Sequence, residues 1–161
     1  MPFREIPVQA AELRVAVCDS LVVAQFLSAG TVAGLDELER VEREVIERHG
    51  RVSLMISAAP SMERISPEVR QRAAQLTTAF EGKLLGLAIV IPGSGLGAAM
   101  LRTVVMAINL LSRSTLHAKS FATASDALAF LKVAPRQTDD VRRITPADVE
   151  ALVSRPLSRA A

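Results

Sequence analysis

The feature that most constrains the fold is a continuous apolar unit at residues 83–113, KLLGLAIVIPGSGLGAAMLRTVVMAINLLSR. Residues 84–91 have the composition of a buried strand, and residues 98–112 have that of a long apolar helix. A glycine-containing turn at residues 92–97 connects them. Three interpretations are open: a nucleotide-binding turn, a helix that seeks a membrane, or a core helix that also offers a face to a partner.

Strand-like and helix-like segments alternate along the rest of the chain. The expected strands are residues 13–18, 21–28, 51–58, 84–91 and 116–122, and the first two form a hairpin with a turn at Asp19 and Ser20. The expected helices are residues 33–49, the segment that starts at Ser66, residues 98–112, and the segment after Thr123. This order predicts an α/β fold with a mixed, mostly parallel sheet of about five strands and helices packed on it.

The domain organisation follows from a change in composition near Pro135. Residues 1–134 are predicted to form one α/β domain, and residues 135–161 form a polar, arginine-bearing tail. A short helix is expected in the tail from Thr145, because a threonine followed by proline and then aspartate is a typical helix start. The sequence leaves open whether this tail docks on the domain or becomes ordered only with a partner.

Composition and charge exclude several function classes. The net charge of +2 comes from 19 Lys and Arg against 17 Asp and Glu, without a run of five like charges, so a nucleic-acid partner is not expected. The chain has no Trp and no Tyr, which disfavours a surface that stacks bases or sugars. The first ten residues lack the layout of a signal peptide, so we expect a cytoplasmic location.

Residues for catalysis or metal binding are scarce. The chain has one cysteine, Cys18, inside an apolar strand, and two histidines, His49 and His117. We therefore predict no catalytic residue, no metal site and no cofactor. Six acidic residues of the helix at 33–49 are interpreted as one solvated face: Asp36, Glu37, Glu39, Glu42, Glu44 and Glu47.

The turn at residues 92–97 contains a G-x-G-x-x-A pattern between a strand and a helix. Its candidate anion-binding residues are Gly93, Ser94, Gly95 and Gly97, which would let a pyrophosphate approach the helix N-terminus. However, the turn belongs to a late strand–helix unit, and no acidic residue lies about twenty positions further on to hold a ribose. We therefore interpret the glycines as a tight turn that lets the helix pack close to the sheet.

The helix after this turn has more apolar surface than a sheet-packing helix needs. Its strongly polar residues, Arg102, Asn109 and Arg113, fall on one narrow line. An apolar run of about fifteen residues, interrupted by Arg102, is too short to span a membrane, so no integral membrane segment is expected. We predict that a second subunit covers this helix, through an interface made of Leu101, Arg102, Val105, Ile108 and Asn109, and contact with a lipid is the alternative.

The order of elements resembles that of the STAS domain (sulfate transporter and anti-sigma-factor antagonist), and in particular small bacterial STAS-like or lipid-binding-like proteins. The similar segments lie within residues 10–133: residues 51–58, Ile65-Ser66-Pro67-Glu68-Val69-Arg70, Ala107-Ile108-Asn109-Leu110-Leu111, Phe121-Ala122-Thr123 and Ala127-Leu128-Ala129-Phe130-Leu131. In STAS proteins a serine at the start of a helix, often preceded by aspartate, is phosphorylated by a partner kinase. The resemblance implies that Ser66 has this role, although Ile65 stands before it here.

The sequence thus predicts a non-enzymatic regulatory or scaffolding module that acts through protein–protein contacts as a homodimer. An anti-sigma-antagonist-like partner switch is one form that such a signalling module takes. The alternative is a module that binds a lipid or another apolar small ligand. A second alternative is an enzyme that holds an anionic nucleotide cofactor at the turn from Gly93 to Gly97.

Overall fold

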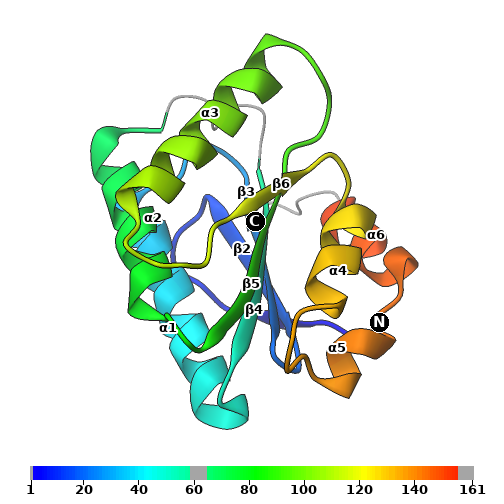
Figure 1. Ribbon diagram of the computed structural model, residues 1–161. Coiled ribbons are helices and arrows are strands. Elements are labelled where there is room, and N and C mark those ends of the chain that lie inside the picture. Colours follow the sequence, from blue (N-terminus) through cyan, green and yellow to red (C-terminus); the bar gives the residue numbers. More distant parts are fainter. Residues whose placement is uncertain (1, 59–64, 156–161) are drawn as a thin grey trace.

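The computed structural model describes residues 2–58 and 65–155, and a single mixed sheet organises them (Figure 1). Its six strands lie side by side in sequence order; the pairs β1–β2 and β2–β3 are antiparallel, and β3–β4, β4–β5 and β5–β6 are parallel. The strands are β1 (Arg4–Ile6), β2 (Leu13–Cys18), β3 (Leu21–Phe26), β4 (Val52–Ser57), β5 (Leu84–Val90) and β6 (Lys119–Phe121). The helices are α1 (Val32–His49), α2 (Pro67–Ala79), α3 (Leu96–Leu111), α4 (Ala124–Lys132), α5 (Asp139–Arg143) and α6 (Pro146–Val153).

The predicted α/β class with a mixed, mostly parallel sheet and packed helices is confirmed. The sequence does not predict strand β1, because its three residues do not show an alternation of apolar and polar side chains. In the structure they are mostly exposed. It joins the sheet by antiparallel pairing of Glu5 with Ala16. Helix α3 begins at Leu96, inside the segment expected as a turn, and the last strand is shorter than residues 116–122.

Helices α1, α2 and α3 cover one face of the sheet (Figure 1). Each connects two neighbouring parallel strands, and each crossover moves one strand further in the same direction. The right-handed preference of such crossovers therefore predicts that all three helices lie on the same face. Alternate residues of the strands point toward them, for example Val15 in β2, Val22 in β3 and Leu54 in β4.

The opposite face of the sheet is covered by α4, α5 and α6 (Figure 1). The remaining alternate residues of strands β2–β5, such as Val23 and Met55, point to this face and pack against the second layer of helices. Four side chains of the C-terminal segment are buried there: Val141, Ile144, Val149 and Leu152. Residues 136–155 therefore dock on the sheet and complete its second core, which decides between the two possibilities that the sequence left open.

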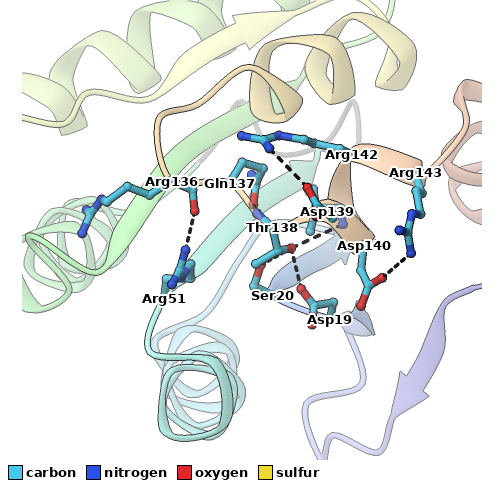
Figure 2. Close-up of polar contacts among 11 residues, drawn as sticks. Asp19, Ser20, Arg51, Arg136, Gln137, Thr138, Asp139, Asp140, Arg142 and Arg143 are labelled. Atoms are coloured by element: carbon cyan, nitrogen blue, oxygen red, sulfur yellow. Dashed lines mark hydrogen bonds and ion pairs between the residues drawn. The ribbon is translucent and has the colours of Figure 1, made fainter.

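Polar side chains hold the start of this C-terminal segment to the amino ends of the parallel strands (Figure 2). The Thr138 hydroxyl donates a hydrogen bond to Oδ2 of Asp19 over 2.5 Å. The Gln137 amide nitrogen donates to Oγ of Ser53 and to the carbonyl oxygen of Leu131, both over 2.8 Å. Gln137 and Ser53 are buried, so these bonds satisfy polar groups that would otherwise be desolvated without a partner.

Arg136 lies at the same edge and adopts a left-handed backbone conformation, with φ of 64°. Its carbonyl oxygen accepts a hydrogen bond from Arg51 over 2.6 Å (Figure 2). Its guanidinium in turn donates to the carbonyl oxygen of Gly82 over 3.2 Å. The segment is thus tied to the residues that precede β4 and β5.

We expect the substitution Val149→Ala to lower the free energy of unfolding by about 2 kcal/mol, since it removes apolar atoms from a packed core and leaves a cavity. Val133→Ala is the matched control, because Val149 is fully buried whereas Val133 is 79% exposed. Urea unfolding of both variants measures the difference. Equal, negligible effects would show that the C-terminal segment does not pack on the sheet.

Candidate functional site

An apolar cavity of about 80 Å³ lies between the sheet and helices α1, α2 and α3. Strands β4 and β5 form its floor, and the three helices form its walls. Nearly all of its lining is aliphatic or aromatic, and typical members are Leu35, Leu54, Leu76, Leu87, Ile89 and Ile108. The cavity has the apolar character that is typical of a small-ligand site.

One acidic residue lines this apolar cavity. Glu42 of α1 is only 1% exposed, and its Oε2 atom has no hydrogen-bond partner. Among the side chains that the structure describes, this is the one buried polar atom without a partner. A buried carboxyl oxygen without a hydrogen bond lowers the stability of the folded state, so its presence calls for a physical explanation.

The environment of Glu42 favours its neutral form. Burial raises the pKa of the Glu42 carboxyl from its ordinary value of 4.5 to about 8, and the negative charge of Glu39 adds to this effect. At neutral pH the group is therefore mostly a carboxylic acid, which donates one hydrogen bond and accepts others. The opposite effect is seen at Glu39, where a hydrogen bond from Arg72 lowers the pKa.

The prediction that Glu42 belongs to a solvated acidic face is wrong. The residue lies four positions after Leu38 and three before Val45, which are both buried, so it shares their face of the helix. That spacing was visible in the sequence. Four of the other acidic residues do form ion pairs with arginines of α1 itself or with Arg72 of α2: Asp36, Glu37, Glu39 and Glu44.

The glycine turn before α3 is exposed and does not line the cavity. The backbone angle φ is +84° at Gly93 and +111° at Gly95, a region that favours glycine. A Cβ atom added at either position would meet no atom within 4 Å. Close packing, the reason predicted for these two glycines, is therefore wrong, and the backbone conformation explains them instead. A cation does lie beside the turn, since the Arg102 guanidinium donates to the carbonyl oxygen of Gly93 over 3.5 Å.

The residues expected to form an interface on α3 point in different directions. Leu101 and Val105 are buried against the chain's own core and line the cavity. The Asn109 amide exchanges two hydrogen bonds with the backbone of Ala118, over 3.0 and 2.9 Å. Arg102 is exposed, and Ile108 is half-buried. Leu101, Val105 and Asn109 therefore serve the fold of the chain itself, which corrects their assignment to an interface.

The outward face of α3 carries an exposed apolar patch that the sequence did not localise. Its large side chains have exposed fractions between 46% and 86%. They are Leu96, Met100, Met106, Leu110 and Leu111, which we call the α3 patch. The expectation that this helix has more apolar surface than the sheet covers is thus met, but on the side opposite Leu101 and Val105.

Ser66 caps the N-terminus of α2, as its position before Pro67 predicted. Its hydroxyl oxygen accepts a hydrogen bond from the backbone N–H of Val69 over 3.3 Å. The side chain is exposed and is therefore accessible from solvent. Glu68 in the first turn also faces the positive end of the helix dipole.

A group of polar side chains meets at the turn between β2 and β3. Oδ1 of Asp19 lies 3.0 Å from Nδ1 of His49, and its Oδ2 accepts from Thr138. The carboxyl group thus stands between the hydroxyl and the imidazole, an arrangement that does not activate the hydroxyl as a nucleophile. Burial, with the nearby carboxylates of Asp19 and others, raises the pKa of the Cys18 thiol and disfavours its thiolate form.

Within residues 2–58 and 65–155, no cluster of three or more His, Cys, Asp or Glu side chains has an arrangement that could hold a metal ion. None of the described helices combines the length and the apolar character needed to cross a membrane. Neither a protein-family model, nor a curated protein, nor a solved structure matches the chain. The resemblance to the STAS family therefore stays a prediction.

The buried Glu42 leads to a prediction about pH. Between pH 4.5 and about 8 the carboxyl is ionised in the unfolded chain but protonated in the folded one. The folded state binds more protons there, so this group makes the free energy of unfolding fall as the pH rises, by up to about 1.4 kcal/mol per pH unit. Glu42→Gln removes this contribution, and we expect its stability relative to the wild type to increase across that range.

Urea unfolding of the two proteins at several pH values measures the difference. Glu47→Gln is the matched control, since Glu47 is an exposed residue on the same helix. If the free energies of unfolding of the wild type and Glu42→Gln differ by the same amount at every pH, the Glu42 carboxyl is not held in its protonated form by burial.

Proposed function

We propose that this protein is a non-enzymatic module that acts through protein–protein contacts, and that the α3 patch joins two copies of the chain. The observation that carries the proposal is the exposure of five large apolar side chains on one helix face. An apolar surface of this kind on an isolated chain favours association. The side chains of the patch are exposed to solvent, so a partner can reach them without any change in the fold.

A second copy is the occupant that suits this surface best. The five side chains carry no charge, and homodimer interfaces are more apolar than those of transient complexes. A two-fold axis brings the same patch of both subunits together, which an apolar surface tolerates without any need for complementary charges. With 16 residues, α3 is about 24 Å long and can pack along its whole length against its copy.

The regulatory part of the proposal rests on Ser66 and on the resemblance to STAS proteins. The hairpin followed by alternating helices and parallel strands matches the order on which that resemblance was based. Ser66 is exposed at the start of α2, where a phosphate group would be stabilised by the helix N-terminus. We propose that modification of Ser66 controls the binding of a further protein. The alternative of a nucleotide cofactor at the turn from Gly93 to Gly97 stays a prediction.

The substitution Leu110→Glu tests the dimer, because Leu110 is 86% exposed and a change there leaves the core intact. We expect the wild type to elute as a dimer in size-exclusion chromatography with light scattering at tens of micromolar, and the variant as a monomer, because burying an unpaired charge opposes association. Val133→Glu, at an exposed site away from α3, should remain dimeric. A monomeric wild type would refute the dimer.

Ser66→Ala and Ser66→Asp test the cap and the switch together. We expect Ser66→Ala to lower the free energy of unfolding by about 1 kcal/mol, because Val69 N–H loses its side-chain acceptor, whereas Asp retains the cap. In a pull-down with partner proteins, the Asp variant should differ from both the wild type and the Ala variant. If all three proteins retain the same partners, Ser66 is a cap and not a switch.

A further inference from the structure

The layer between the sheet and helices α1–α3 offers a binding site that is separate from the α3 patch. We propose that the apolar cavity holds a small, neutral molecule that is apolar except for one hydroxyl or carbonyl group, and that this group hydrogen-bonds to Glu42. The site stands on two independent observations: an apolar cavity, and a fully buried lining residue, Glu42, whose carboxyl has an oxygen without a hydrogen-bond partner.

The polar groups of the cavity define what the ligand must provide. Among the residues of its lining, Glu42 and Thr77 carry polar side chains. The Thr77 hydroxyl donates its proton to the carbonyl oxygen of Ala73 over 3.1 Å, so its oxygen is left as an acceptor. A neutral Glu42 can both donate and accept. A ligand hydroxyl can therefore either accept a hydrogen bond from the protonated Glu42 carboxyl or donate one to it. A ligand carbonyl can accept a hydrogen bond from the O–H group of Glu42.

The volume limits the size of the ligand. A dry cavity of roughly 150 Å³ can hold benzene, so a cavity of about 80 Å³ suits a smaller molecule such as a short-chain alcohol or ketone. A lipid acyl chain would need more space. The lining side chains Ala73, Val104 and Ile108 are only partly buried, so the wall between α2 and α3 reaches the surface and provides a route of entry.

A pair of probes separates the role of the hydrogen bond from that of the apolar walls. Ethanol and propane are smaller than benzene, have the same number of heavy atoms and differ in a hydroxyl against a methyl group. Each is titrated into the wild type while methyl NMR signals are recorded. We expect saturable shifts with ethanol, with a Kd on the order of 10 mM, at Leu76, Leu87 and Ile108, which line the cavity. Methyl groups of Val23 and Leu131, on the other face of the sheet, serve as controls and should not respond.

The variant Glu42→Leu tests the polar contact. We expect the variant to raise the Kd of ethanol about tenfold, because the hydrogen bond is lost, and to leave the Kd of propane unchanged. Glu47→Leu on the exposed side of α1 should bind both probes as the wild type does. In the wild type, ethanol should also shift the ¹³C signal of the Glu42 carboxyl, a measurement that does not depend on how the variant folds.

Two results would overturn the proposal. If neither probe gives saturable shifts at the cavity methyls, the cavity holds only water or nothing. If ethanol binds without a shift of the Glu42 carboxyl signal and equally well to Glu42→Leu, the acid is not its partner. Both results are independent of the oligomeric state, so they leave the proposed dimer untouched.

Discussion

The burial of both faces of the sheet is the constraint on which the rest of the structure depends. All six residues of β3 are buried, and β5 exposes little more. A sheet of this kind needs helices on both sides. The three crossover helices all fall on one face, because the strands lie in sequence order. The other face must then be covered by residues C-terminal to β6, which explains why α4–α6 belong to the core and why buried polar residues such as Gln137 fix the start of that segment.

The layer of α1–α3 has two properties that a purely structural layer does not require. Its inner side leaves a cavity and places the carboxyl of Glu42 beside it without a hydrogen bond. Its outer side exposes the α3 patch to solvent. Helix α3 contributes to both, since Leu101 and Val105 point inward whereas Met106 and Leu110 point outward. An unpartnered buried acid and an exposed apolar face both reduce the stability or solubility of an isolated chain, and each is relieved by an occupant of the chemistry that we propose.

The fold was largely predictable from the sequence, but the candidate site was not. Strong local signals, such as the apolar run of β5 and the cap at Ser66, placed most elements within a few residues. Strand β1 lacked such a signal, because its place depends on pairing with β2. For α1, the dense charge favours a solvated face, but the spacing places Glu42 on the same face as Leu38 and Val45. The cavity depends on how α1, α2 and α3 meet above the sheet, which no pattern within one segment encodes.

Three features together determine the protonation state of the Glu42 carboxyl: the burial of the residue, the apolar cavity beside it and the missing hydrogen-bond partner. A direct titration by NMR of the side-chain ¹³C signal of Glu42 in the wild-type protein measures it. A midpoint near pH 8 is the predicted result. A midpoint near the ordinary value of 4.5 would show that the carboxyl is solvated or paired, and would contradict the assignment of this cavity as a binding site.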